Sequence, residues 1–289
     1  MIITLAIIIN LSLTPSKAQL LLKPGNSAYQ KIVVKNYGSP VNLSPDIFPF
    51  YTTDLTGNPQ IKTSLTTYDP LSDLKNVSMA YPVMNWKKTI RLETNEEKDF
   101  IFKFSSDPIN TTDKYYLLAF KAEGDPITTQ QIKQTATFGV PVMISAGNTE
   151  NDFAAKLTIT DFKVPFLNDS LLPLKAKATV ENTGLHFFDL NGYWEVIPII
   201  GSPKRYPIIS DTIITKGTRN VRCQTISNDC KLYPSLPLGF YKVRLVIEGI
   251  NLYKKEKAIL VFPFSPLAGI LSLIFVWKRI IKNKTVHSN

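Results

Sequence analysis

The pattern that most limits how this chain can fold is a series of short runs in which apolar and polar residues alternate. They include "AYQKIVVKN" (28–36), "KYYLLAFKAE" (114–123) and "GFYKVRLVIEG" (239–249). Side chains point to opposite faces along a β-strand, so this alternation predicts strands with one buried face. Prolines and glycines, 20 and 13 in number, separate the runs, and no amphipathic helical stretch of useful length occurs among them. We therefore expect an all-β protein.

The predicted strands fall into two groups, which the polar stretch "AGNTEND" at 146–152 separates. The first group is expected at 28–36, 41–51, 89–94, 99–105, 114–123 and 135–145. The second is expected at 155–164, 172–182, 192–200, 210–221, 239–249 and 254–262. Short strands in this number are typical of immunoglobulin-like folds. We predict two tandem immunoglobulin-like β-sandwiches, over 19–147 and 152–262.

Two segments of the first domain carry more specific expectations. Residues 89–94 and 99–105 flank the turn "NEEK" and should form a strand pair. Residues 52–82 are rich in Asp, Ser, Thr and Pro, and should form a long surface excursion between strands.

A Val-x-Asn-x-Gly sequence occurs in both predicted domains, at 34–38 and at 180–184. In each it should end the second strand. We expect the Asn side chain to bond to turn backbone and the Gly to adopt a positive φ angle. The repeat therefore indicates a repeated fold rather than a ligand signature.

The C-terminal part of the chain resembles a membrane segment. Residues 258–277 contain no charge, and about 20 apolar residues in a helix cross a hydrocarbon core of about 30 Å. We expect a transmembrane helix over 263–281 and a basic cytoplasmic tail over 282–289. The alternative is a buried last strand followed by a short apolar tail, because two prolines interrupt the run.

Residues at the end of this segment indicate its orientation. Trp277 suits the membrane border, and Lys278 and Arg279 follow it directly. Positive charges favour the cytoplasmic side, which predicts a single-pass plasma-membrane protein with its ectodomain outside. At the other end of the chain, residues 1–18 admit two interpretations, a signal peptide or the first strand of the domain.

The charge and the cysteine content indicate which kinds of partner and which cellular compartment to expect. The net charge is +10, but four basic residues and no acidic ones lie in the last twelve positions, so we do not expect nucleic-acid binding. Cys223 and Cys230 enclose a short polar segment in the predicted ectodomain, which favours a disulfide. A metal site would require further ligands.

The chain offers little for catalysis, and we predict no enzyme activity, no cofactor and no metal. Two oxygen-rich segments, 54–58 and 69–73, fit turns better than a calcium loop. His186 lacks a recognisable catalytic partner, and its neighbourhood "HFFDLNGYW" is rich in aromatic residues. We therefore treat one cluster as a candidate contact for a partner or a glycan, namely His186, Phe187, Phe188, Tyr193 and Trp194.

The order of several motifs resembles bacterial surface proteins of the WxL-interacting type. The motifs are "LTPSKAQLLLKPGNS", "IVVKN", "NW" at 85–86, "IRLETNEEKDFIFKF", "KYYLLAFKA", "VENTGLHFFDLNG" and "GFYKVRLVI". They span roughly residues 11 to 284, including the C-terminal helix. The resemblance implies two immunoglobulin-like domains that are anchored in the membrane and associated with the cell wall and other surface proteins.

The chain is also similar in domain pairing to periplasmic chaperones of pilus assembly. Those proteins hold a subunit's C-terminal carboxylate with a basic residue, and Lys17 lies near the matching place here. The principal expectation is a membrane-anchored protein that binds a cell-wall polymer or another surface protein. The alternatives are a chaperone-like assembly protein for extracytoplasmic subunits and a wall-glycan hydrolase that works with two carboxylates.

Overall fold

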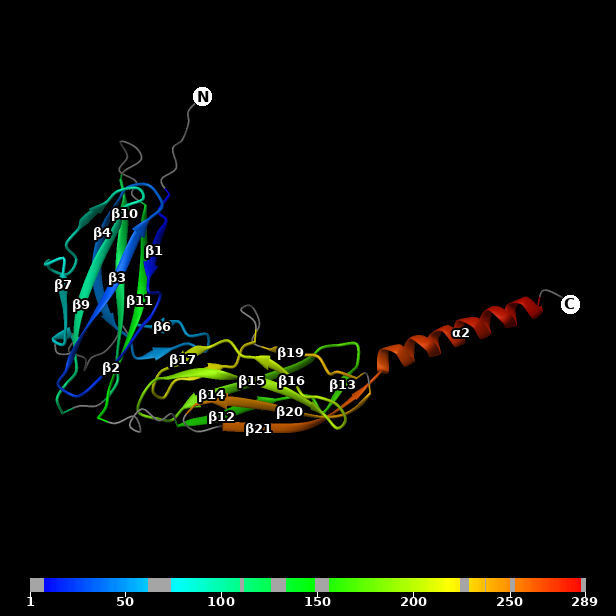
Figure 1. Cartoon of the computed structure of the whole chain (residues 1–289). Helices are drawn as coiled ribbons and strands as arrows, with labels where there is room; N and C mark the ends of the chain where they lie inside the picture. The colour runs from blue at the N-terminus through cyan, green and yellow to red at the C-terminus, as the bar shows by residue number, and fades with distance from the viewer. Residues whose placement is uncertain are drawn as a thin grey trace, which may run out of the picture. The chain divides into compact units, whose positions relative to one another are not determined.

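The protein is mostly β-strand, as the alternating runs predict (Figure 1). The computed structural model describes residues 8–61, 74–109, 112–125, 134–148, 156–223, 229–236, 238–249 and 253–286. Within these residues each predicted run contains a strand.

The chain divides into two compact units. Unit 1 comprises residues 1–154, 184–187 and 214–217, and unit 2 comprises 155–183, 188–213 and 218–289. The main division, after residue 154, falls close to the polar stretch at 146–152. The two short segments that group with unit 1 from the second half of the chain have no counterpart in the sequence-based domain boundaries.

Unit 1 is a sandwich of two sheets. One has the order β1 (Leu11–Thr14), β3 (Ser27–Asn36), β9 (Glu97–Ser105), β7 (Val77–Tyr81). The other has the order β2 (Ala18–Leu22), β11 (Thr135–Ala146), β10 (Lys114–Gly124), β4 (Val41–Pro49), β8 (Ile90–Leu92). Strands β5 (Thr52–Thr53) and β6 (Pro59–Gln60) pair with each other as a small hairpin.

The core of unit 1 follows from the alternation along β9. Phe100, Phe102 and Phe104 are fully buried, while the residues between them are partly exposed. The rings of Phe100 and Phe102 pack edge-on against Phe120 of the facing sheet. Aromatic pairs in this geometry add to the stabilisation that comes from burying their area.

Unit 2 is also a sandwich of two sheets. One has the order β12 (Leu157–Lys163), β14 (Leu174–Asn182), β18 (Thr218–Asn220), and β19 (Cys230–Leu232) pairs with β14 as well. The other has the order β13 (Leu167–Asp169), β21 (Tyr253–Phe262), β20 (Gly239–Glu248), β15 (Phe188–Pro198), β16 (Lys204–Pro207), and β17 (Asp211–Ile213) pairs with β15. The fully buried Trp194 stacks on Phe162 with 5.5 Å between ring centroids.

Both units divide their first strand between the two sheets. In unit 1, β1 pairs antiparallel with β3, and β2 then pairs parallel with β11. In unit 2, β12 pairs antiparallel with β14, and β13 then pairs parallel with β21. A proline, Pro15 or Pro165, lies in each switch, where the missing N–H interrupts the ladder. This shared device supports two related folds in tandem.

The predicted pairing of residues 89–94 with 99–105 is wrong. β8 pairs with β4 in one sheet, whereas β9 lies between β3 and β7 in the other. A short link can turn within a sheet or cross between sheets, and alternation looks the same in both cases. Part of the predicted excursion at 52–82 is likewise the edge strand β7, and residues 62–73 lie outside the described residues.

A helix, α2 (Phe264–Val286), follows β21 where the sequence predicts one. Asp169 Oδ2 accepts hydrogen bonds from Ser265 N at 2.7 Å and Ser265 Oγ at 2.6 Å, and the hydroxyl contact lowers the pKa of Asp169. Among the described residues, no helix is both long and apolar enough to cross a membrane. The transmembrane assignment of 263–281 is therefore not confirmed.

Candidate functional site

One edge of unit 1 is open. Strand β2 covers β11 only from Val142 to Ala146, and over Thr135–Pro141 no described strand pairs with β11 on its outer side. The twelve residues of β11, "TATFGVPVMISA", carry no charge. An uncharged and uncovered strand edge is a template for pairing with another chain.

The backbone hydrogen bonds show which groups face outward along this edge. Gly124 N donates to Gln134 O, which places the even-numbered residues of β11 towards β10. Gly147 N donates to Leu22 O, which places the odd-numbered ones outward. Residues 135, 137 and 139 therefore present outward N–H and C=O groups. Pro141, which lacks an N–H, ends this free stretch.

The corresponding strand in unit 2 carries lysines along the part that no described strand covers. Strand β13 covers β21 only over Leu260–Phe262, and the preceding "YKKEKA" contains three lysines. Lys255 Nζ donates to Ile159 O at 3.2 Å, and Lys257 Nζ donates to Val164 O at 2.6 Å. Lysines on an edge strand discourage pairing with another chain. The contrast between two similarly placed strands singles out β11.

A buried polar cluster in unit 1 centres on Asp113, whose side chain is 1% exposed. Its Oδ2 accepts hydrogen bonds from Phe187 N at 2.5 Å and Tyr115 OH at 2.8 Å. Its Oδ1 accepts one from Ser145 Oγ and lies 2.7 Å from His186 Nδ1. A carboxylate can only accept, so the proton of this contact lies on Nδ1. Several donors thus satisfy one buried charge.

The Asp113 cluster contains Ser, His and Asp, but not in the arrangement of a nucleophile relay. In a relay, serine and aspartate contact opposite nitrogens of the imidazole. Here Ser145 Oγ lies 2.7 Å from the same Nδ1 atom that faces Asp113, and it also donates directly to Asp113. Ser145 is fully buried. The geometry fits a structural network that holds residues 184–187 in unit 1.

Tyr115 extends the cluster. Its hydroxyl lies 3.1 Å from Thr215 Oγ1 and accepts from Thr215 N at 3.1 Å, while Thr215 Oγ1 donates to Leu185 O at 2.8 Å. Burial, followed by the charge of Asp113, raises the pKa of Tyr115. The ring packs against Phe50 in a small apolar cluster. Segments 184–187 and 214–217 are therefore bound to unit 1 by both polar and apolar contacts.

The predicted aromatic contact residues do not gather on one exposed surface. His186 is buried at 7% exposure, and Phe187 packs against the apolar cluster around Tyr115. Trp194 is fully buried in the core of unit 2. Phe188 is half-buried, and Tyr193 lies under the guanidinium of Arg205, 4.6 Å from its ring centroid. Their role as a partner contact stays a prediction.

Asn36 forms the bonds that the turn motif predicts, whereas Asn182 bonds to a distant segment and the glycine of the first motif acts differently. Buried Asn36 donates through Nδ2 to Ser39 O at 2.9 Å and accepts from Gly38 N at 2.9 Å. Buried Asn182 donates to Ile213 O at 3.2 Å. Gly38 does not have a positive φ angle. A Cβ there would lie 2.0 Å from Ile8 O, so the close approach of the backbone is what requires glycine.

The predicted disulfide between Cys223 and Cys230 is confirmed, with a Cα–Cα distance of 5.1 Å. Of the predicted membrane-border residues, Trp277 lies on α2 and is 67% exposed, and Lys278 follows it. The side chain of Arg279 lies outside the described part of the chain.

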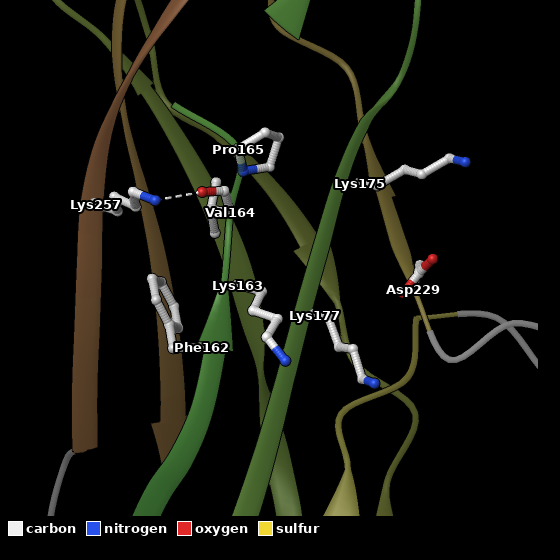
Figure 2. A pocket seen from close by; sticks show the side chains of 8 residues that line it. All are labelled: Phe162, Lys163, Val164, Pro165, Lys175, Lys177, Asp229 and Lys257. Carbon is white, nitrogen blue, oxygen red and sulfur yellow. Dashed lines mark hydrogen bonds between the residues drawn. The ribbon is translucent and has the colours of Figure 1, made fainter. Parts of the chain in front are cut away.

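A lysine-rich pocket of about 400 Å³ opens on unit 2 (Figure 2). Phe162, Val164 and Pro165 form its apolar part. Its charged lining residues are Lys163, Lys175, Lys177, Lys257 and Asp229. Figure 2 shows Lys163 and Lys177 side by side on neighbouring strands. The sequence carries no signal for this pocket, because its lysines come from separate predicted strands.

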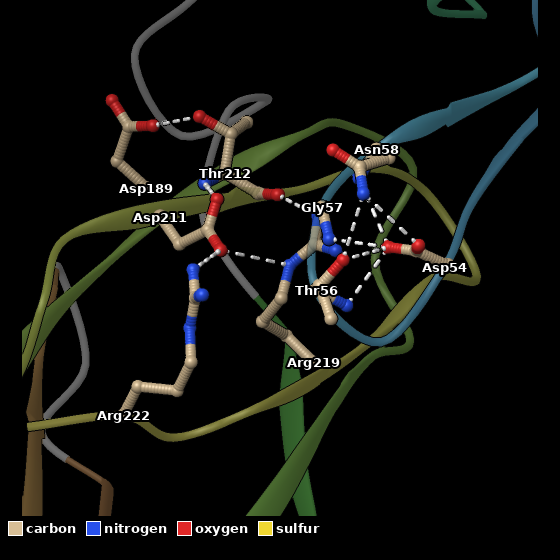
Figure 3. A network of polar contacts seen from close by, with 9 residues as sticks. All are labelled: Asp54, Thr56, Gly57, Asn58, Asp189, Asp211, Thr212, Arg219 and Arg222. Carbon is tan, nitrogen blue, oxygen red and sulfur yellow. Dashed lines mark hydrogen bonds and ion pairs between the residues drawn. The ribbon is translucent and has the colours of Figure 1, made fainter. Parts of the chain in front are cut away.

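The oxygen-rich segment at 54–58 is a closed turn (Figure 3). Asp54 Oδ1 accepts from the backbone N–H groups of Thr56, Gly57 and Asn58 at 2.7–2.9 Å, and from Thr56 Oγ1 at 2.6 Å. The hydroxyl contact, together with the backbone donors, lowers the pKa of Asp54. Donors thus occupy the oxygen that a calcium ion would use. The second such segment, 69–73, lies outside the described residues.

Figure 3 also shows a charged network that belongs to unit 2. Arg219 is 1% exposed, and its Nε lies 3.4 Å from Asp211 Oδ2, to which Arg222 Nη2 donates at 3.2 Å. Arg219 Nη2 donates to Thr212 O at 2.5 Å, and Thr212 Oγ1 donates to Asp189 Oδ1 at 2.5 Å. A buried cation with this many acceptors is expected to hold its surroundings in place.

No family model matches the sequence, and no curated protein does. Similar solved structures include a chaperone in a pre-assembly complex with a tip adhesion subunit, from the archaic chaperone-usher Csu pili of Acinetobacter baumannii. That match has a TM-score of 0.40 and 11% identity over 86% of this chain and 97% of that one. The class 5 fimbriae chaperone CfaA matches with a TM-score of 0.39 and 11% identity, covering 88% of this chain and 100% of that one. The Escherichia coli chaperone DraB matches with a TM-score of 0.37 and 9% identity, covering 88% and 98%. Likenesses this distant do not decide function.

Proposed function

We propose that this protein is a non-enzymatic binding protein that holds an extended segment of a partner protein by strand addition to β11. The observation that carries the proposal is the uncharged, uncovered edge over Thr135–Val140. The matching edge of unit 2 instead carries Lys255 and Lys257, whose side chains bond to backbone carbonyls, and edge lysines discourage pairing. Main-chain hydrogen bonds supply affinity in this mode of recognition, and pockets for alternate side chains supply specificity.

The edge also indicates what the partner segment looks like. The half-buried Phe138 and the buried Val140 point into the core, whereas Thr135, Thr137 and Gly139 are exposed on the other face. An added strand would continue this alternation. We expect a segment of about six residues with apolar side chains at every second position and without charges on the apolar side.

The open edge is compatible with two forms of this function, which differ in how long the partner stays bound. In one, the protein is a chaperone-like assembly factor that holds an extracytoplasmic subunit transiently. In the other, it is a surface protein that keeps its partner. We rank the two forms equally, because the distant similarity to chaperone structures does not decide between them. The lifetime of the complex separates the two forms.

An extracytoplasmic location is part of the proposal. The disulfide between Cys223 and Cys230 supports it, because structural disulfides persist mainly in oxidising compartments. Membrane attachment through the C-terminal segment, with the basic end in the cytoplasm, rests on the sequence pattern alone, as does the resemblance to the WxL-interacting type.

The test uses Thr137, whose N–H faces outward. Thr137→Pro removes one outward donor and leaves the ladder to β10 intact, whereas Thr137→Ala keeps the donor and serves as the control. A photo-crosslinking side chain at residue 137 of the full chain identifies the partner segment. We expect Thr137→Pro to weaken its binding at least about tenfold, since a lost donor leaves a partner carbonyl unpaired. Equal binding by both variants would overturn the proposal.

A further inference from the structure

Two pairs of like charges that folding alone does not favour lie in and beside the lysine pocket of unit 2. Lys163 on β12 lies directly opposite Lys177 on β14. Lys175, two residues earlier on β14, lies directly opposite Lys231 on β19. Like charges directly opposite each other across a sheet are destabilising. Folding stability therefore does not explain why two such pairs lie on one face of the sheet.

These lysines share one face of the sheet. Along β14, Leu174, Ala176 and Ala178 are fully buried, so Lys175 and Lys177 point outward. Lys163 and Lys231 are exposed at their paired positions. At the backbone, strand spacing sets the opposed lysines about 5 Å apart across neighbouring strands, and Lys175 and Lys177 about 7 Å apart along β14. The four lysines thus form an array over β12, β14 and β19.

Little negative charge balances the array. Asp229 is the one acidic residue among those that line the pocket, and Asp161 Oδ2 accepts a hydrogen bond from Lys163 Nζ at 3.1 Å. Within the described part of the chain, Lys175, Lys177 and Lys231 form no ion pair. Lys257 adds a further positive charge at the rim, where its Nζ bonds to Val164 O.

We infer that this lysine face binds an extended phosphate-bearing polymer, such as a polyol-phosphate chain. Four cations spread over three neighbouring strands match repeated charges on a chain better than a single small anion does. The surface is hollowed, with Phe162 and Pro165 beside the lysines, which suits a chain lying in it. A flat bilayer of anionic lipids would instead require a projecting surface. This site is independent of the β11 edge.

The test measures binding of a short poly(glycerol phosphate) chain to the full-length protein as salt is increased. Each phosphate contact of a single-stranded polyanion contributes about −0.7 to the slope of log affinity against log salt. Lys175→Gln with Lys177→Gln should reduce the slope by about 1.4 and weaken binding about tenfold at low salt. The matched control, Lys204→Gln with Lys254→Gln, removes the same charge from exposed positions elsewhere on unit 2 and should leave binding unchanged.

Four outcomes would overturn the inference. They are the absence of binding, an equal loss in both double variants, equal affinity for polyglutamate, and lysine-dependent binding to anionic vesicles in place of the polymer. Because Thr137→Pro leaves unit 2 untouched, it should bind the polymer normally. Failure of the β11 proposal is therefore distinguishable from failure of this one.

Discussion

The Nδ1 atom of His186 lies 2.7 Å from the Oδ1 atom of Asp113, although 73 residues separate them in the chain. The contact is nearly closed to solvent, with side chains that are 6% and 1% exposed. It joins a segment from the second half of the chain to the residue that directly precedes strand β10 of unit 1. The histidine that stood out in the sequence is thus part of a buried network.

Asp113→Asn should destabilise unit 1 by about 2–3 kcal/mol, because hydrogen bonds to a buried charge are stronger than neutral ones and the new amide N–H groups face donors. Chemical denaturation with urea measures the effect. The control is Asp99→Asn, which breaks the exposed pair with Lys31 and should cost less than about 1 kcal/mol. Similar losses in both variants would contradict a special role for Asp113.

Tyr115 should make stability fall in alkaline solution. Burial raises its pKa in the folded protein, so the stabilisation is complete below the unfolded value of about 10 and is lost as pH rises towards the folded value. We expect the unfolding free energy of the wild type to drop more steeply above pH 10 than that of Tyr115→Phe. Parallel profiles would show that the phenol keeps an ordinary pKa.

The lysine face should cost stability in the absence of ligand. Lys177→Gln removes one member of the opposed pair with Lys163 and should raise the unfolding free energy by about 0.2–1 kcal/mol. Thermal and urea unfolding at low salt measure this increase in the unfolding free energy. Added salt should reduce the increase, because it screens the repulsion between the lysines. Lys204→Gln serves as the control. A loss of stability in Lys177→Gln would mean that the lysine supports the fold.

Removing the disulfide should destabilise unit 2. Cys223→Ser with Cys230→Ser opens a short loop, for which chain entropy gives about 2–3 kcal/mol. Urea unfolding of the oxidised wild type against the double variant measures the difference. Wild type treated with a reductant should match the variant. An unchanged midpoint would show that the crosslink does not constrain the unfolded chain.

Calcium should not bind the turn over residues 54–58. It should therefore leave the melting temperature of the protein unchanged. The Asp54 Oδ1 atom already accepts four hydrogen bonds from within the turn, and a cation would have to displace them. Thermal unfolding with added calcium and with a chelator checks this. If calcium raised the melting temperature of the wild type but not of Asp54→Ala, the turn would be a metal site after all.

The amino-acid sequence alone is sufficient to predict the local features of the fold. Period-two alternation identified the β class and most strands, since one buried face is a property of each strand taken singly. The spacing of Cys223 and Cys230 identified the disulfide, because the two lie close together in the chain. Asn36 is predictable as a turn anchor for the same reason, because its partners Gly38 and Ser39 lie two and three residues away.

The tertiary structure alone decided which strands meet and which edges stay open. β8 and β9 are neighbours in sequence but lie in different sheets, and the uncovered part of β11 is uncharged whereas that of β21 carries Lys255, which bonds to β12. The four donors around Asp113 and the lysine pairs of unit 2 likewise depend on register between distant segments. The physical reason is that a strand's own sequence states which face is buried, whereas its partners follow from the packing of the whole sandwich.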